Sequence, residues 1–448
     1  MSAEDLTDLS HLRLDLIGAL EAKIDGSPGM LHLAHLLPEN PAGDYWLVMK
    51  PMQLAHLQLN FLSFIQDLEN EFAKRQKTRK IDAAEKAILL RVEKNPLADA
   101  DEPLAELAEL ARTCGVAVFD AIVQYRRLPD PKFMVGKGKL SDIGLRATQI
   151  GANLLIFDHE LTPAQVRSIN DFTGLKVIDR TQVILDIFAR RAHSREGKIQ
   201  VELAQLKYLL PRLSHSDSSL SRLAGGIGGV GPGETKLEID RRRIRERITR
   251  LDKDLQTITK SRQQRRGKRQ KSDLPVISIV GYTNAGKSTL INTLTKSSVL
   301  VEDKLFATLD TKSARLRFPR DTEAIITDTV GFIHNLPEEL FTAFRATLDE
   351  LHQADILLHV VDISSNHFEN QIAAVNNILE KLEINDKPII MVFNKADCLT
   401  DKALLQTLCR RFDAVAISAL DKSTLNGLLQ NIESFLADRS HAHILRNR

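Results

Sequence analysis

Residues 276–294 read VISIVGYTNAGKSTLINTL, and they are the most informative segment for the fold class. An apolar run leads into the pattern GxxxxGK[ST] at 281–288, and an amphipathic helical pattern follows. In such a strand–loop–helix setting, backbone N–H groups wrap a phosphate chain, the lysine reaches the β- and γ-phosphates, and the hydroxyl binds Mg²⁺. The stretch therefore predicts an α/β domain with a parallel-rich, doubly wound sheet, in which the phosphates are bound by Gly281, Tyr282, Thr283, Asn284, Ala285, Gly286, Lys287, Ser288 and Thr289.

Two flanking segments are predicted to complete the phosphate end of this site. AIITDTVGF ends an apolar strand at Asp328, whose carboxylate can orient Mg²⁺ through water, and the Gly331 amide can sense the γ-phosphate. Upstream, FATLD offers the Thr308 hydroxyl as a further Mg²⁺ ligand. The predicted catalytic residues are Lys287, Thr308 and Gly331, and the same segments supply Phe306, Ala307, Thr329 and Val330.

The base end of the site is predicted from two later motifs. A carboxylate can accept both the N1–H and the exocyclic N2–H₂ of guanine, which adenine does not offer. Asp397 in MVFNKAD is placed to do so, which predicts GTP and GDP as the ligands. Together with the loop in VAISAL, this motif predicts base contacts from Asn394, Lys395, Asp397, Ser418, Ala419 and Leu420.

A second glycine-rich segment, GGIGGVGPG at 225–233, has a different setting. Apolar residues recur in steps of three and four on both sides of it, within 199–213 and 237–258. This spacing predicts two helices that pack as an antiparallel hairpin, with the glycine segment at its turn. A dinucleotide-binding fingerprint needs a strand before its glycines, so this segment is not predicted to bind a nucleotide.

The second helix of this hairpin is strongly basic. Residues 241–271 contain 14 Lys or Arg against 3 acidic residues. Such an excess of one sign repels itself unless an anion neutralises it, which favours nucleic acid over a solvated helix face. The predicted RNA contacts are Gly225, Gly226, Gly228, Gly229, Gly231, Gly233, Lys236, Arg241, Arg242 and Arg243.

The N-terminal part is less informative. Strand-like and helical runs alternate over 82–195, which predicts a small α/β domain with a largely parallel sheet. Within it, GKGK at 136–139 opens a helix; this turn either receives RNA or nucleotide phosphate or is simply solvated. In an N-terminal extension of unassigned function, 1–81, LRLDLIGALEAKI and LNFLSFIQDLENEFAKR predict helices and DYWLVM predicts a strand.

Composition limits the remaining possibilities. The 448 residues carry a net charge of only +2, so nucleic-acid affinity must come from local clusters. The cysteines, Cys114, Cys398 and Cys409, lack metal-binding spacing. We expect a cytoplasmic monomer without signal peptide or membrane span, with peripheral membrane association left open. The expected regions are 1–81, 82–195, the hairpin and basic linker at 196–272, the nucleotide-binding domain at 273–436, and a basic tail at 437–448.

Over about residues 83–436 the chain resembles the HflX family of ribosome-binding GTPases, close to the Obg-like branch of translation-factor relatives. The segment GGIGGVGPGETKLEIDRRRI carries this resemblance most specifically. The resemblance implies hydrolysis of GTP to GDP and phosphate. It also implies binding to the rRNA and proteins of the large ribosomal subunit, with the hairpin turn near the peptidyl-transferase region, and splitting or rescue of stalled ribosomes under stress. ATP binding by the N-terminal domain is a further implication.

Two positions bear on hydrolysis. Phe332 stands where Ras-like proteins carry a water-orienting glutamine, so intrinsic hydrolysis is expected to be slow without help from elsewhere. Asn284 stands where similar GTPases hold K⁺ beside the phosphates. Our hypothesis is that K⁺, a ribosomal surface, or both supply the missing positive charge. Two alternatives stay open: a GTP-dependent regulatory switch that binds a protein partner, and an RNA-remodelling ATPase acting through the N-terminal domain.

Overall fold

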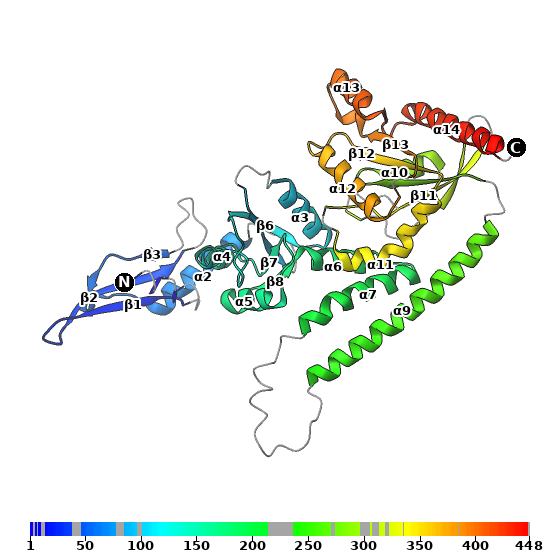
Figure 1. Ribbon diagram of the computed structural model, residues 1–448. Coiled ribbons are helices and arrows are strands. Elements are labelled where there is room, and N and C mark those ends of the chain that lie inside the picture. Colours follow the sequence, from blue (N-terminus) through cyan, green and yellow to red (C-terminus); the bar gives the residue numbers. More distant parts are fainter. Residues whose placement is uncertain are drawn as a thin grey trace, which may run out of the picture. The chain divides into compact units, whose positions relative to one another are not determined.

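In the computed structural model, the chain forms two compact units, Met1–Val183 and Ile184–Arg448 (Figure 1). The described residues are all except 3–4, 7, 10–13, 38–45, 78–84, 96–100, 214–235, 270–273, 296–304, 307–312, 319–321, 335, 385 and 447–448.

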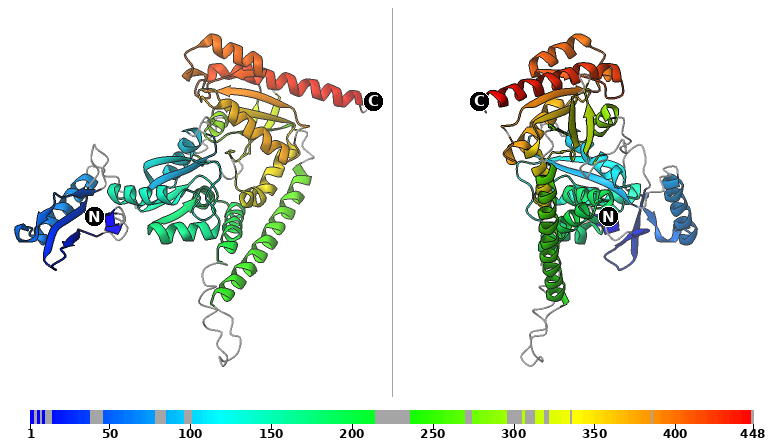
Figure 2. Two further views of the ribbon diagram at one scale, coloured as in Figure 1. Left: turned by 60° about the vertical axis from the view of Figure 1, so that its left-hand side comes forward. Right: turned by 90° about the vertical axis from the view of Figure 1, so that its right-hand side faces the viewer.

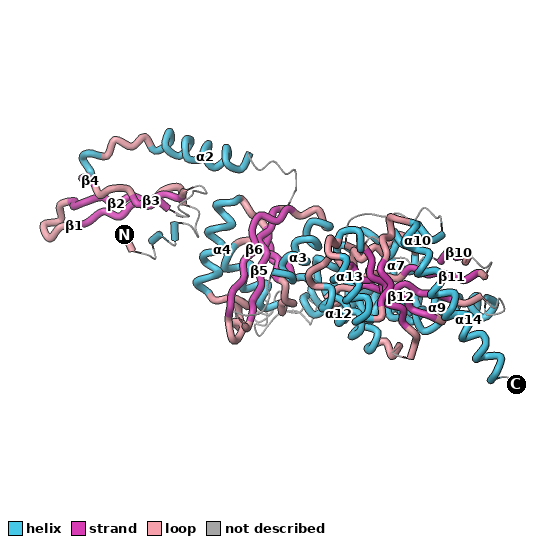
Figure 3. Tube along the Cα trace, turned by 90° about the horizontal axis from the view of Figure 1, so that it is seen from above, coloured by secondary structure: helices cyan, strands magenta, loops and turns pink. Residues whose placement is uncertain are grey.

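The first unit opens with a small antiparallel sheet, followed by a helix (Figure 3). Its central strand β2 pairs with all three others. The helix expected over 12–24 is wrong, because Ile17–Ala22 form a strand. Gly26, at φ +78°, lies in the turn that reverses the chain into β2, and this long-range pairing overrides the local helical pattern. The elements are β1 (Ile17–Ala22), β2 (Pro28–Leu36), β3 (Trp46–Val48), β4 (Met52–Gln53), η1 (Leu54–His56) and α2 (Phe61–Lys77).

The rest of the first unit is a four-stranded parallel sheet of order β6-β5-β7-β8, as its alternating pattern predicted. Helix α4 begins at Lys137 directly after Gly136, so the GKGK segment opens a helix as expected. The elements are β5 (Lys86–Glu93), α3 (Asp101–Thr113), β6 (Ala117–Tyr125), α4 (Lys137–Ile150), β7 (Leu154–Phe157), α5 (Pro163–Thr173), β8 (Lys176–Asp179) and α6 (Arg180–Arg191), whose last residues belong to the second unit.

Two long helices, α7 (Arg195–Arg212) and α9 (Lys236–Arg269), lie side by side in the second unit (Figure 2). Arg247 adds two hydrogen bonds of 2.7 and 2.8 Å to the Glu202 carboxylate. The apolar stripe read from the spacing is the contact face, formed by Ile199, Leu203, Leu206, Ile248, Leu251, Leu255 and Ile258. The predicted turn glycines, from Gly225 to Gly233, lie outside the described residues.

The second unit also contains a six-stranded sheet of order β10-β11-β9-β12-β13-β14. Strand β10 is antiparallel to β11, and the other neighbours are parallel. The strands are β9 (Val276–Gly281), β10 (Ser313–Arg317), β11 (Glu323–Asp328), β12 (Ile356–Asp362), β13 (Ile389–Asn394) and β14 (Ala414–Ala416). The helices are α10 (Lys287–Thr295), α11 (Glu338–Leu348), η3 (Asp349–Gln353), α12 (Phe368–Lys381), η4 (Ala396–Cys398), α13 (Lys402–Phe412), η5 (Lys422–Thr424) and α14 (Leu425–Arg446).

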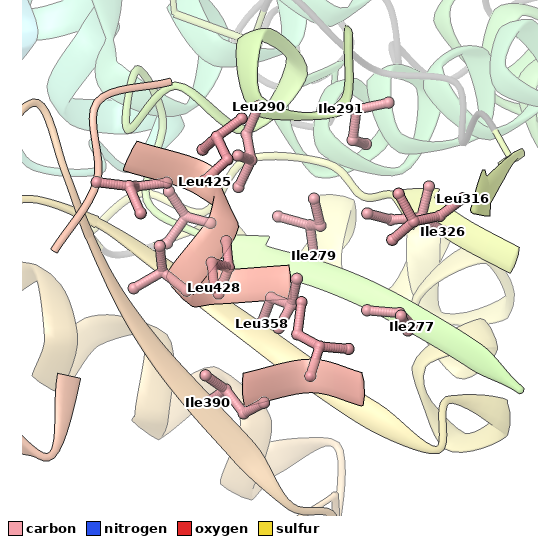
Figure 4. Packing of buried hydrophobic residues seen from close by; sticks show 14 of the residues in the cluster. Ile277, Ile279, Leu290, Ile291, Leu316, Ile326, Leu358, Ile390, Leu425 and Leu428 are labelled. Carbon is pink, nitrogen blue, oxygen red and sulfur yellow. The ribbon is translucent and has the colours of Figure 1, made fainter. Parts of the chain in front are cut away.

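The strands of this sheet read as apolar runs because helices cover both of its faces. On one face, Ile277 and Ile279 of β9 are fully buried and pack with Leu290 of α10 and Leu428 of α14 (Figure 4). Strands β9, β11 and β13 run in the same direction, so their carboxyl ends share one edge of the sheet. The predicted motifs follow these ends directly, and ligands of such sheets bind there. In the described part of the chain, no helix is long and apolar enough to cross a bilayer.

Candidate functional site

The phosphate loop connects the end of β9 to the start of α10, and its backbone demands particular residue types. A Cβ on Gly281 (φ +154°) would lie 2.2 Å from the Val360 carbonyl oxygen of the neighbouring strand. A Cβ on Gly286 (φ +89°) would lie 2.2 Å from Asn394 Nδ2. Asn284 is exposed at φ +61°, a left-handed conformation that asparagine tolerates well. The loop therefore cannot keep this path with other residues at its glycine positions.

Lys287 is buried within the curve of the loop. Its Nζ donates hydrogen bonds to the carbonyl oxygens of Gly281, at 3.0 Å, and Tyr282, at 2.6 Å. Burial lowers the pKa of Lys287 to about 8, and the negative charge of Asp328 opposes this shift. The loop carbonyls thus hold the ammonium where the phosphates of a nucleotide bind in P-loop proteins.

Ser288 and Asp328 meet at the start of α10. The Ser288 hydroxyl donates to Asp328 Oδ2 at 2.9 Å, and Asp328 is fully buried at the end of β11. A hydroxyl and a carboxylate are hard oxygen ligands that suit Mg²⁺, so this donor set fits the predicted ion. Thr289 lies half-buried in the same helical turn. The predicted third ligand, Thr308, and its neighbour Ala307 lie outside the described residues.

The segment after β11 pairs with the phosphate loop. Thr283 N–H donates to the Phe332 carbonyl at 2.8 Å, and Phe332 N–H donates to the Gly281 carbonyl at 3.2 Å. A Cβ on Gly331 would lie 2.9 Å from Thr283 Cγ2 and 3.1 Å from Lys287 Nζ. Gly331, predicted to sense the γ-phosphate, therefore lies against both groups, and any side chain there would crowd them.

Three further predicted residues lie around this pairing. Thr329 donates its hydroxyl to the Ile279 carbonyl at 2.6 Å, and Val330 is buried. The Tyr282 hydroxyl accepts the backbone N–H of His334 at 2.8 Å. These contacts attach the segment after β11 to β9 and to the phosphate loop.

At the base end, Asn394 braces two loops. Its Nδ2 donates to the Ala285 carbonyl at 2.8 Å, and its Oδ1 accepts the Ala419 N–H at 2.9 Å. The side chain thus connects the phosphate loop to the loop at 418–420, a role that the sequence did not reveal. The Leu420 side chain is exposed.

Asp397 presents an exposed carboxylate after the end of β13. The Ser418 hydroxyl donates to it, and this hydrogen bond lowers the pKa of Asp397 below its ordinary value. The carboxylate is therefore ionised at neutral pH. Lys395, at φ +60°, pairs with Asp362 Oδ2 at 2.6 Å. Asp362 ends β12 in the sequence VVDIS, which carried no motif and gave no signal of this partner.

An aromatic cluster of three rings connects α6 with α11 and with the segment before β10. Phe306, at φ +58° and buried, lies with its ring centroid 4.6 Å from that of Phe188 in α6. The Phe188 ring in turn lies 5.2 Å from that of Phe344 in α11. Sequence reasoning missed Phe188 and Phe344, because only their tertiary contacts distinguish them from ordinary core residues.

The basic helix α9 presents cations on the side away from α7. Of the predicted RNA contacts, Lys236 begins the helix, Arg241 is half-buried, and Arg242 and Arg243 are exposed near Glu246 and Asp240. Helical spacing places three more cations opposite the apolar stripe. These are exposed and have no acidic partner within 4 Å among the described residues: Arg250, Lys253 and Lys260.

Models of known families match three consecutive regions of the chain. They are described as "GTP-binding GTPase N-terminal" over 101–189, "GTP-binding GTPase Middle Region" over 191–269 and "50S ribosome-binding GTPase" over 276–395.

Two curated relatives align with most of the chain. It is 46% identical over 349 residues to the GTPase HflX of Caldanaerobacter subterraneus subsp. tengcongensis, covering 78% of this chain and 80% of that protein. It is 45% identical over 320 residues to the GTPase HflX of Escherichia coli, covering 71% and 75%. Among solved structures, a GTP-binding protein from Sulfolobus solfataricus in complex with GDP is 26% identical, covering 79% of this chain and 99% of that one, with a TM-score of 0.43.

Proposed function

This chain belongs to the HflX family of GTPases, and from that premise we propose that it binds the large ribosomal subunit and splits or rescues stalled ribosomes under stress. It binds GTP and hydrolyses it to GDP and phosphate. The observation that carries the ribosomal proposal is the basic surface of α9, in the same compact unit as the GTP site. Because the proposed partner is the ribosome, we expect this protein to act in the cytoplasm.

In the proposed complex the nucleotide lies along the edge where β9, β11 and β13 end. The loop at 281–288 and Lys287 bind the phosphates, and Asp397 reads guanine. Ser288, and Asp328 through water, would hold Mg²⁺, which neutralises charge on the β- and γ-phosphates when bound. Gly331 would report whether the γ-phosphate is present, because it lies against Lys287 and Thr283.

Packing supports coupling between the nucleotide and the basic helix. Helix α7 packs against α9. It also contacts α11, the helix that follows Gly331. Phe188 of α6 also contacts Phe306, in the segment between α10 and β10, and Phe344 of α11. A change in the position of Phe306 or of α11 would therefore move the helices that they contact, α6 and α7, and α7 is the first helix of the hairpin.

Ribosome binding is tested by reversing two exposed charges on α9. We expect Arg250→Glu with Lys253→Glu to weaken co-sedimentation with large subunits, in the presence of a non-hydrolysable GTP analogue, by about tenfold or more. Each lost phosphate contact should also reduce the slope of log K against log[salt] by about 0.7–0.9. GTP affinity should stay unchanged, because both residues lie outside the GTP site.

The matched control is Lys381→Glu with Arg410→Glu. It makes the same change in net charge, on exposed residues of α12 and α13. Equal weakening by both double variants would assign the effect to net charge, and undiminished binding of the α9 variant would contradict the proposed surface. Parallel co-sedimentation with GDP and with ATP tests which nucleotide supports ribosome binding. Co-sedimentation that is the same with every nucleotide would favour the alternative of a regulatory switch with a protein partner. Co-sedimentation that depends on ATP would favour the RNA-remodelling alternative.

A potassium site at Asn284 is part of the proposal. Its exposed side chain in the phosphate loop can offer an amide oxygen to a cation beside the phosphates. We expect single-turnover hydrolysis to be about tenfold or more faster in K⁺ than in Na⁺, because the cation adds charge that the site otherwise lacks. Asn284→Gly removes the amide yet tolerates φ +61°, so it should abolish the difference. Equal rates of the unmodified protein in the two salts would exclude the potassium site.

A further inference from the structure

We propose that the Thr283 hydroxyl positions the water that attacks the γ-phosphate, a role that Ras-like proteins give to a glutamine. The inference deepens the proposed GTP site and rests on it. Phe332 stands at the position of that glutamine. Its ring is 1% exposed and belongs to the core, so it neither reaches the nucleotide nor offers a hydrogen bond. Another group must orient the water.

Thr283 lies where that group is needed. Its backbone N–H is bonded to the Phe332 carbonyl, its methyl group borders Gly331, and Gly331 borders Lys287 Nζ. Thr283 therefore lies at the boundary between the phosphate loop and the γ-phosphate sensor. In phosphoryl transfer the attacking water stands in line beyond the γ-phosphate, which is this boundary.

The hydroxyl of Thr283 has unused hydrogen-bonding capacity. The side chain is 6% exposed, and its Oγ1 has no hydrogen-bond partner among the described residues. Leaving a buried hydroxyl without a hydrogen bond is unfavourable for the folded protein. Neighbouring threonines of the same unit avoid this cost: Thr329, Thr293 and Thr295 all donate to backbone carbonyls. A buried hydroxyl without such a bond is suited to a partner that arrives with the substrate.

The chemical step balances with water as the only co-reactant. The water oxygen forms a bond to the γ-phosphorus, and the bond from that phosphorus to the β–γ bridging oxygen breaks, leaving its electron pair on GDP. One hydrogen of the water is held by Thr283 Oγ1 during the attack, and the released proton ends on the phosphate product. Thr283 itself is unchanged, so its contribution is orientation and hydrogen bonding.

Thr283→Val tests this role, because valine keeps the branched shape and removes the hydroxyl. We expect single-turnover hydrolysis of preloaded GTP to fall about 10–100-fold, as when one positioned hydrogen-bonding group is lost. Affinities for GTP and GDP should stay within about threefold, since the loop backbone and Lys287 bind the ground state. The complex with GDP and fluoroaluminate, which imitates the transition state, should weaken along with the rate. Thr283→Ser should restore most of the rate.

Thr295→Val, at the end of α10, is the matched control and should hydrolyse GTP normally. A normal rate for Thr283→Val would overturn the inference, as would a serine variant as slow as the valine variant, which would point to packing of the methyl group. A loss of GTP affinity equal to the loss of rate would assign Thr283 to binding instead. Ribosomes are absent from these reactions, so failure of the ribosomal proposal would not change their outcome.

Discussion

Asp397→Asn is expected to lower the affinity for GTP by about 10²–10⁴-fold. The carboxylate accepts two hydrogen bonds from guanine, each worth about 1.5–3 kcal/mol with a charged partner, so their loss corresponds to about 3–6 kcal/mol. Asparagine would also turn its NH₂ group toward a guanine donor. The Ser418 hydrogen bond lowers the pKa of Asp397 further below neutral pH, so the native side chain is a charged acceptor.

Competition binding with a fluorescent guanine nucleotide measures this loss. Xanthine carries a carbonyl where guanine carries its amino group, so the variant should bind xanthosine triphosphate better than GTP. Asp413→Asn is the matched control, because Asp413 is exposed in the same unit and asparagine tolerates its φ of +48°. An Asp397→Asn variant that binds GTP normally, or a native protein that binds ATP as tightly as GTP, would disprove guanine recognition by this residue.

Gly281→Ala is expected to disrupt the nucleotide-binding sheet itself. The new methyl group would meet the Val360 carbonyl at 2.2 Å, inside a central strand that cannot move aside, and φ +154° is itself unfavourable for alanine. We expect a loss of at least about 3 kcal/mol in local stability, hence about 10²-fold faster hydrogen exchange. GTP binding should be lost together with the loop path.

Hydrogen exchange measured on peptides resolves this effect. Peptides from β9 and β12 should lose protection, while those from β5 and β7, in the first unit, serve as an internal reference. Gly427→Ala is the matched control: nothing lies within 4 Å of its added Cβ in α14, so the change should be neutral or stabilise by up to about 1 kcal/mol. Unchanged protection of β9 in Gly281→Ala would contradict the steric explanation.

Local patterns were sufficient for much of the fold. The phosphate loop between β9 and α10, the parallel sheet of the first unit and the apolar stripe between α7 and α9 all follow from residue spacing within one or two elements. Strand β1 did not, because its six residues also fit a helical pattern and only pairing with β2 makes them a strand. Periodicity within a short segment contains no information about a partner elsewhere in the chain.

The same limit applies to the site. Motif spacing correctly predicted that Asp328 lies near Lys287 and Ser288, because each motif follows the end of a parallel strand. Contacts across more than 30 residues of sequence determine three other features: the hydrogen bond from Asn394 to Ala285, the pairing of Lys395 with Asp362 and the position of Phe188. The sequence also gave no sign that the Phe332 ring is buried.

The packing of the Phe188 ring against Phe306 and Phe344 has a mechanical consequence. Close-packed rings cannot shift singly without opening a void or a clash, so they tend to move as a set. Phe188 sits one helical turn before the end of α6, and α7 starts at Arg195, only four residues after that end. A displacement of Phe306 would therefore shift the end of α6 and the start of α7, the helix that packs along α9.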